Sequence, residues 1–194
     1  PNLGNKGISA FIIEKGMPGF EVGKKIPKMG IRASDTCELI FNNVKVPKEN
    51  LLGEIGKGFK IAMASLEGGR ISIAAQARGL AQGAIDEAVM YTQERMQFGK
   101  RLSQFQNTQF ELAEMQTKVD AARLLVYRAA TAKDKGEPYT HLAAMAKMFA
   151  ATTASDVTRR ALQLFGGYGF TREYPMEVKM RDAKITEIYE GTTE

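Results

Sequence analysis

Four short stretches of the 194-residue chain carry side chains that could meet a charged ligand. In the first, Glu67-Gly68-Gly69-Arg70, the arginine could bind a phosphate or carboxylate through paired hydrogen bonds, or form a local ion pair with Glu67. We expect its two glycines to break a helix. The second stretch, 95–100, combines a cation, an amide, an aromatic ring and a glycine, which is typical of a helix C-terminus or of a binding site.

The other two stretches lie in the last thirty positions. Gly166-Gly167-Tyr168-Gly169 lacks the spacing of a dinucleotide-binding fingerprint, so it indicates either a helix cap or a backbone that a ligand can approach closely. The stretch 181–192 places the carboxylate of Glu190 between an aromatic ring and a glycine. On these residues alone, its simplest interpretation is a solvated tail.

Composition argues against several other kinds of site. One cysteine, Cys37, and one histidine, His141, supply neither an internal disulfide nor a zinc ligand set, so we expect no metal. The formal charge of +5 is scattered rather than gathered in a stripe, which favours a phosphorylated small ligand over nucleic acid. No apolar run reaches the roughly 18 residues of a membrane span.

The elements that must position these stretches change in type near 53–58. Before this point, apolar and β-branched runs at 8–13 and 37–46 predict short strands separated by glycine and proline turns. Within the second run we expect a kink or turn at Asn42-Asn43, followed by a second short strand that ends at Pro47. After it, apolar residues recur every three or four positions over 73–91, 112–129 and 142–164, which predicts three long helices. The first is rich in alanine and glycine, so we expect it inside a bundle or at a subunit contact.

Together these stretches resemble one family, the acyl-CoA dehydrogenases, in both order and spacing. Lys28-Met29-Gly30-Ile31-Arg32 and Val46-Pro47 are similar to the family's middle β-domain. The remainder is similar to its C-terminal domain through Arg70, the 95–99 motif, the segment 163–170, Arg181-Asp182-Ala183-Lys184-Ile185 and Tyr189-Glu190-Gly191-Thr192. The branch that the chain resembles most is the short-chain, butyryl-CoA type.

The resemblance implies an α+β fragment with two parts. Residues 1–54 would be the C-terminal part of a small antiparallel β-domain. Residues 55–194 would form an all-α, up-and-down helical bundle, truncated at its end. Forty-five residues of strand are few for a closed sandwich or barrel, so we expect the remaining strands outside this sequence.

The resemblance also implies an activity, the FAD-dependent conversion of a short-chain acyl-CoA to its trans-2-enoyl-CoA. Glu190 would be the catalytic base that removes the α proton, while hydride leaves the β carbon for flavin N5. A positioned base is needed because an α C–H beside a thioester is a very weak acid. Some relatives carry their base immediately before the arginine, where this chain has Gly69. The expected substrate-binding residues are Leu66, Glu67, Gly68, Gly69, Arg70, Tyr189 and Gly191.

Two parts of the chain match FAD-binding positions of the family. The residues that would reach the FAD of a neighbouring subunit are Arg95, Gln97, Phe98, Gln106, Gln163, Leu164, Phe165, Gly166 and Gly167. Those that would contact FAD near the catalytic turn are Thr192, Thr193 and Glu194. The resemblance therefore implies a homo-oligomer, a dimer of dimers in the full-length protein, with an electron-transferring flavoprotein as acceptor.

Alternatives on the same scaffold are an acyl-CoA oxidase and a glutaryl-type dehydrogenase, and a third is a catalytically inactive helical fragment. The strand residues that cover the flavin ring in the family lie outside this sequence. We therefore expect the isolated chain to bind FAD weakly or not at all, and to be inactive. The compartment would be the cytoplasm in a bacterium or the mitochondrial matrix in a eukaryote.

Overall fold

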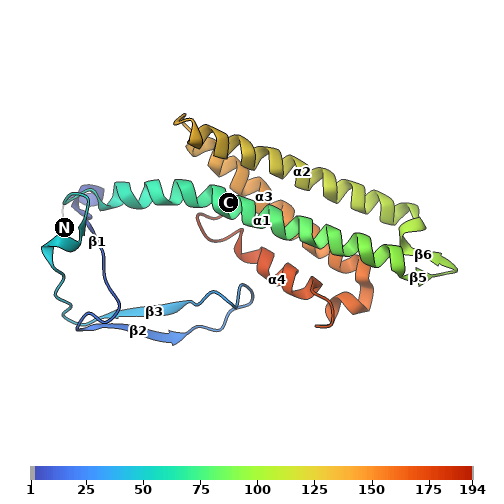
Figure 1. Ribbon diagram of the computed structural model, residues 1–194, viewed down its shortest axis with the longest axis horizontal. Helices are drawn as coiled ribbons and strands as arrows, with labels where there is room; N and C mark the ends of the chain where they lie inside the picture. The colour runs from blue at the N-terminus through green and yellow to red at the C-terminus, as the bar shows by residue number, and fades with distance from the viewer. Residues whose placement is uncertain (1–2, 194) are drawn as a thin grey trace. The chain divides into compact units, whose positions relative to one another are not determined.

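The computed structural model describes residues 3–193, which divide into two compact units. The first unit comprises residues 1–28 and 32–66, and the second comprises 29–31 and 67–194. Helix α1 (Gly58–Glu94) contributes residues to both units. Strands β1 to β4 belong to the beginning of the chain and the long helices to the remainder, where the only strands described are the short pair β5 and β6, as the blue-to-red colouring in Figure 1 shows. The predicted α+β fold class is confirmed.

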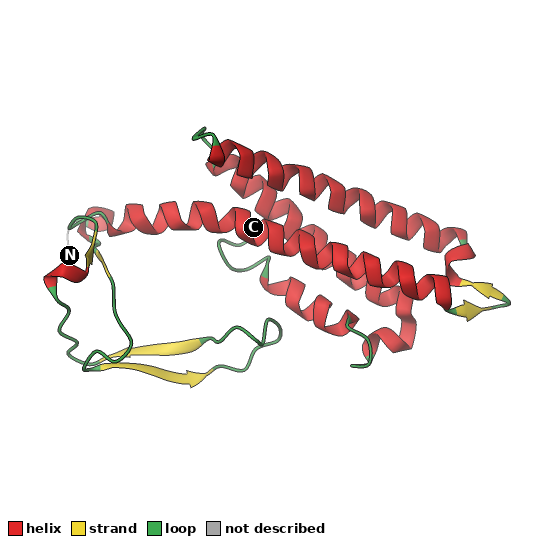
Figure 2. Ribbon diagram, in the orientation of Figure 1, coloured by secondary structure: helices red, strands yellow, loops and turns green. Residues whose placement is uncertain are grey.

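The first unit is built from two short antiparallel ladders, drawn as yellow strands in Figure 2. Strand β2 (Phe20–Lys25) pairs with β3 (Cys37–Phe41), and Phe20 stands opposite Phe41 with ring centroids 5.1 Å apart. Strand β1 (Ala10–Phe11) pairs with β4 (Leu51–Leu52). The 3-10 turns η1 (Gly4–Gly7) and η2 (Lys48–Asn50) flank these short strands.

The strand expectations are corrected in part. The run at 8–13 forms a strand only over Ala10–Phe11. The run at 37–46 forms a strand that ends at Phe41, before the expected turn at Asn42-Asn43, but the second short strand expected before Pro47 does not form. A turn follows at Asn43, whose φ of 53° lies in the left-handed region that asparagine tolerates. Strand β2 was not predicted, because Gly23 and two lysines interrupt its apolar alternation.

The second unit is helical. Helix α1 is followed by α2 (Gln106–Asp134), α3 (Thr140–Phe165) and α4 (Met176–Ile185), shown in red in Figure 2. Between α1 and α2 the chain forms a small hairpin, β5 (Met96–Gln97) and β6 (Lys100–Arg101), and the 3-10 turn η3 (Leu102–Gln104). The turn η4 (Gly166–Phe170) follows α3 directly. The expected helix break at 67–70 is wrong, because α1 is continuous through both glycines.

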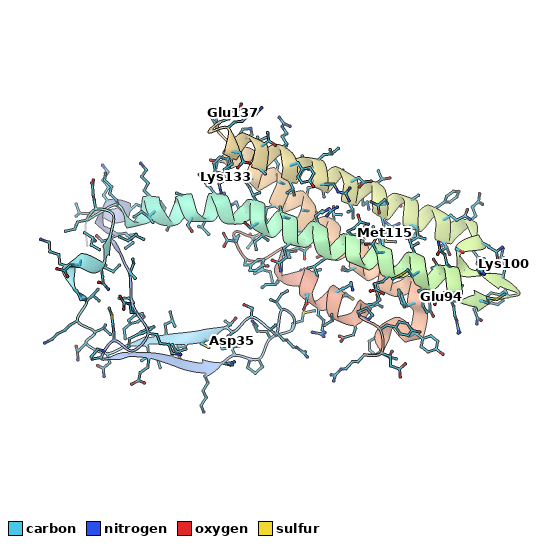
Figure 3. All side chains as sticks on the ribbon, viewed as in Figure 1. Asp35, Glu94, Lys100, Met115, Lys133 and Glu137 are labelled. Atoms are coloured by element: carbon cyan, nitrogen blue, oxygen red, sulfur yellow. The ribbon has the colours of Figure 1, made fainter. Side chains whose placement is uncertain are left out.

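The core of the helical unit consists largely of alanine. On α1 the buried residues recur at helical spacing, and small side chains at such positions let neighbouring helices approach closely. Met115 of α2, labelled in Figure 3, is among the largest fully buried side chains. This packing confirms the bundle expected from the periodicity. The buried alanines of α1 are Ala74, Ala77, Ala81, Ala84 and Ala88.

A charge network also joins α2 to α3. The guanidinium of Arg160 lies 2.6 Å from Glu111 and 3.0 Å from Glu114, and its side chain is only 12% exposed. Lys118 lies 2.9 Å from Asp156 and 3.1 Å from Glu114, which extends the network along both helices. Such a network can fix the register of two helices more firmly than isolated surface pairs can.

Within residues 3–193, none of the helices is both long and apolar enough to cross a bilayer. The same residues contain no group of three histidine, cysteine or acidic side chains that could hold a metal ion.

Candidate active site

The turn that follows α4 carries Glu190 in an unusual backbone conformation. Its φ is 57° and that of Gly191 is 101°, so two successive residues have positive φ. For a residue with a side chain, this conformation costs on the order of 1–2 kcal/mol. Contacts from the surrounding helices must therefore hold the turn in place.

Two cationic side chains bind consecutive carbonyl groups of this turn. Arg70 Nε on α1 donates to the Glu190 carbonyl oxygen at 3.2 Å, and Lys147 Nζ on α3 donates to the Gly191 carbonyl oxygen. Arg70 thus binds the backbone of the turn, and within the described chain it forms no ion pair with Glu67. Burial lowers the pKa of Lys147, which is only 3% exposed.

The Glu190 carboxylate lies directly against Gly69 of α1. A Cβ atom built at Gly69 would come within 2.7 Å of Glu190 Cδ, closer than real side chains approach, so glycine makes room for the carboxylate. Glu190 Oε2 is buried and has no hydrogen-bond partner among residues 3–193. Because buried polar atoms are nearly always hydrogen-bonded, this unpartnered oxygen is a candidate for contact with a ligand.

Tyr189, the preceding residue, also reaches α1. Its hydroxyl donates a hydrogen bond of 2.6 Å to Gln76 Oε1, and burial raises its pKa. The side chains of Tyr189 and Glu190 therefore both contact α1. Gln76 and Lys147 were missed by the sequence analysis, because each is a single polar residue in a helical run with no motif around it.

The other predicted substrate residues lie on the same part of α1. Glu67 and Gly68 are half-buried and adjoin Gly69, and the Cβ position of Gly68 lies 3.1 Å from Lys133 Nζ. Leu66 precedes Glu67 on α1 but belongs to the first unit. Only its position on the helix groups it with these residues.

Beyond the turn, the backbone N–H of Thr193 donates to the Glu187 carbonyl at 3.1 Å, while Thr192 is exposed. Glu194 lies outside the described residues.

A second group of predicted residues lines a hollow of about 430 Å³ at the far end of α1. Figures 1 and 2 show this end, where the β5–β6 hairpin meets the ends of α1 and α2. The hollow brings together the predicted residues Arg95, Gln97, Gln163, Leu164, Phe165, Gly166 and Gly167. Its further lining residues, which were not among the predicted FAD-binding positions, are Tyr91, Leu102, Tyr168 and Thr171.

Aromatic side chains form a wall of this hollow. Tyr91 and Phe165 stack with centroids 4.1 Å apart, and the guanidinium of Arg95 lies 5.2 Å from the centroid of the Tyr168 ring. Two predicted residues are not among its lining. Phe98, at the tip of the hairpin, is 91% exposed, and Gln106 is exposed at the start of α2.

The two groups are far apart along α1. Arg70 lies on α1, and Arg95 follows the last residue of this helix, 25 positions further along the chain, which corresponds to about 37 Å at a helical rise of about 1.5 Å per residue. The Glu190 turn and the hollow therefore occupy separate places on the helical unit.

Comparison with known proteins identifies the family. The profile described as "Acyl-CoA dehydrogenase, C-terminal domain" matches residues 56–194. The chain belongs to the acyl-CoA dehydrogenase family. It is 58% identical to the short-chain specific acyl-CoA dehydrogenase of Megasphaera elsdenii over 98% of this chain and 50% of that protein.

Solved structures of the family agree closely with this chain. The butyryl-CoA dehydrogenase of Megasphaera elsdenii is 57% identical, with a TM-score of 0.98 over 100% of this chain and 50% of that one. A chain in the structure reported for the electron transferring flavoprotein of Acidaminococcus fermentans is 60% identical. Its TM-score is 0.97 over 98% of this chain and 50% of that one. The chain thus spans about half the length of these acyl-CoA dehydrogenase relatives.

The second hollow has the features that a flavin nucleotide requires. Arg95, Gln97 and Gln163 bring a cation and amide groups, which suit phosphate and polar ring atoms. The Cβ positions of Gly166 and Gly167 face open space, so a ligand can approach the bare backbone there. The residues of this acyl-CoA dehydrogenase domain therefore fit part of an FAD molecule.

Proposed function

We propose that this chain is the catalytic half of an FAD-dependent short-chain acyl-CoA dehydrogenase, which forms trans-2-enoyl-CoA. The observation that carries the proposal is the position of Glu190. Its carboxylate is packed against Gly69, one oxygen is buried without a partner, and the backbone behind it is bound by Arg70. The short-chain substrate class is supported by 58% identity to a relative of that specificity.

In the proposed reaction, Glu190 removes a proton from the carbon next to the thioester carbonyl. The electron pair of that C–H bond becomes the second bond between the α and β carbons as hydride leaves the β carbon. FAD, when bound, supplies the acceptor for this hydride. A carboxylate held in one orientation suits the step because a weakly acidic C–H reacts only with a base placed against it.

The residues around Glu190 would bind the acyl-CoA. Glu67, Gly68 and Gly69 lie on α1 next to the carboxylate, and we assign the thioester end of the substrate to them. Tyr189 is anchored to Gln76 and would line the acyl chain. Gly191 keeps the turn free of a side chain where the thioester must approach. We also assign Leu66 to this group, from its position on α1.

For the cofactor, we assign the hollow around Arg95 to the FAD of a second copy of the protein. The roughly 37 Å along the chain between Arg70 and Arg95 supports this assignment, because it separates the hollow from the Glu190 turn of the same chain. Phe98 and Gln106 would complete that contact, and Thr192 to Glu194 would contact the flavin near Glu190. The enzyme would therefore be a homo-oligomer, and the family resemblance implies a dimer of dimers.

The electron acceptor that we propose is an electron-transferring flavoprotein. The proposal is supported by the 60% identical chain in the structure reported for such a flavoprotein from Acidaminococcus fermentans.

Anaerobic mixing of the complete, FAD-loaded protein with acyl-CoA esters of increasing length tests this function. We expect butyryl-CoA to bleach the flavin absorbance fastest and to yield crotonyl-CoA. Absence of bleaching with every ester would contradict the proposal. Rapid consumption of oxygen in air would instead indicate an acyl-CoA oxidase, and release of carbon dioxide from glutaryl-CoA would indicate a glutaryl-type dehydrogenase.

A further inference from the structure

Lys147 is a buried lysine that the proposed mechanism does not use. It lies in the middle of α3, where its neighbours on the buried face are small apolar residues such as Ala146, Ala150 and Ala151. Only 3% of Lys147 is exposed, although lysine is among the residue types that are almost never fully buried. A buried ammonium group is costly unless a hydrogen-bond acceptor or an opposite charge lies next to it.

The partner of Lys147 is the backbone of the catalytic turn. Lys147 Nζ donates a hydrogen bond to the carbonyl oxygen of Gly191, the residue that follows Glu190. Hydrogen bonds from a charged donor are roughly twice as strong as those between neutral groups. The charged groups that interact with this ammonium are Arg70 from α1, and Glu187 and Glu190 from the segment after α4.

The positive charge of Lys147 carries an energetic cost in the folded protein, although the carboxylates of Glu187 and Glu190 reduce it. Burial is the main cause that lowers the pKa of Lys147, and the positive charge of Arg70 acts in the same direction. The unfolded chain therefore holds this proton more tightly than the folded chain does, so protonation of Lys147 opposes folding at neutral pH. A stability-driven sequence would place an apolar residue here.

We propose that Lys147 is a positioning residue of the active site: from α3 it holds the Gly191 carbonyl and thereby fixes the backbone that aims the Glu190 carboxylate. This inference rests on the proposed function. Arg70 binds the adjacent carbonyl from α1, so the turn is held from two helices. With only one of these contacts, the positive φ values of Glu190 and Gly191 would have less to hold them in place.

The test compares Lys147→Met with wild type in the complete, FAD-loaded enzyme. Methionine keeps most of the length and removes the charge and the donor. We expect the rate constant of anaerobic flavin reduction at saturating butyryl-CoA to fall about 10- to 100-fold, as for a misplaced catalytic group. The dissociation constant for butyryl-CoA and the FAD content should stay close to wild type. Amide deuterium exchange of 187–193 should become faster, and the thermal midpoint should be unchanged or raised.

Lys135→Met is the matched control, because Lys135 is exposed just after α2. It should leave the rate, the exchange and the midpoint unchanged. A normal rate of reduction in Lys147→Met would overturn the proposal. So would a variant that loses its fold or its FAD, because that result would make Lys147 a structural residue.

A further comparison separates this inference from the proposed function. If wild-type enzyme reduces its flavin and Glu190→Gln does not, but Lys147→Met behaves as wild type, only the positioning role fails. If no acyl-CoA reduces the wild-type flavin, the proposed function fails. Deuterium exchange of 187–193 in Lys147→Met still reports whether the contact holds the turn, because that measurement does not require activity.

Discussion

At the scale of single residues, the Glu190–Gly191 turn has a backbone conformation that amino acids with side chains rarely adopt. Positive φ at Glu190 is the kind of local strain that clusters at functional sites, and here the contacts that compensate for it come from Arg70 and Lys147. Gly69 completes the arrangement by leaving room for the carboxylate. The position of the Glu190 carboxylate thus depends on the absence of a side chain at Gly69 as much as on the Arg70 and Lys147 groups that bind the turn.

Gly69→Ala tests this dependence on space. The added methyl group should push the flexible carboxylate of Glu190 aside and slow flavin reduction about 100-fold. The thermal midpoint should not fall, because alanine is favoured over glycine inside a helix by about 0.5–1 kcal/mol. Stopped-flow reduction by butyryl-CoA and thermal unfolding of the complete enzyme measure the two effects.

Gly79→Ala on the same helix is the control, because nothing lies within 4 Å of its Cβ position. It should raise the midpoint slightly and leave the rate unchanged. Equal rates for Gly69→Ala and Gly79→Ala would show that the space at Gly69 is irrelevant to the reaction.

Sequence motifs identified residues of the two sites, but they did not identify Lys147 and Gln76, the side chains that hold the Glu190 turn and Tyr189 in place. Glu190 and Arg70 stand in short patterns whose order matches the family, so the sequence predicts that both belong to a site. Lys147 and Gln76 stand alone in helical runs, where a single polar residue usually faces solvent. Only the packing of α3 and α1 against the turn shows that these two side chains face inward.

At the scale of elements, Arg160 links α3 to α2 through carboxylates. Its hydrogen bond lowers the pKa of Glu114. Burial alone would raise the pKa of Asp156, but the hydrogen bonds and charges of Lys118, Arg159 and Arg160 outweigh it and lower that pKa as well. Stability from these carboxylates is therefore present above about pH 4, the range of their unfolded pKa, and is lost as the pH falls through the lowered folded values.

Arg160→Met should destabilise the enzyme by about 1–3 kcal/mol at pH 7, since it removes the donor that Glu111 and Asp156, both about one-third exposed, share. The loss of stability below about pH 4 should also become shallower than in wild type, because the folded pKa values return toward ordinary ones. Urea unfolding of the complete enzyme between pH 3 and pH 7 measures both effects.

Arg159→Met is the comparison for Arg160→Met, because Arg159 is 63% exposed and contacts only Asp156, at 3.1 Å, by an ion pair within the described chain. Its cost should be below about 1 kcal/mol. If the two variants had the same cost and the same pH profile, the network would not be what joins α2 to α3.

Helical periodicity predicted the long helices because each buries one continuous face. The expected break at 67–70 is wrong for a physical reason: α1 accommodates Gly68 and Gly69 because Lys133 and Glu190 pack where their side chains would be. Strands were predicted less well, because short ladders of two to six residues carry too few alternating positions to set their limits.

At the scale of the molecule, the two units differ in how much they bury. Between residues 3 and 57 no residue is buried, and large side chains such as Phe11, Val22, Leu39 and Phe41 are about half exposed. The helical unit has an extensive buried core. A two-stranded ladder without a covered apolar face is marginally stable in water.

Limited proteolysis of the isolated chain, residues 1–194, should therefore cut first between residues 3 and 57. It should leave a resistant fragment that contains α1 through α4, and mass spectrometry of the fragments identifies the cut sites. Early cuts within α2 or α3 would show that the helical core is not the stable part of this chain.

The most direct test of the whole account is the exchange of the substrate's α hydrogens in deuterated water. The complete, FAD-loaded enzyme and its Glu190→Gln variant are incubated with butyryl-CoA, and deuterium in the recovered thioester is measured by mass spectrometry. We predict that wild type introduces deuterium at the α carbon and that the variant, with its FAD content unchanged, introduces none. Equal incorporation by both proteins would contradict the assignment of Glu190 as the base.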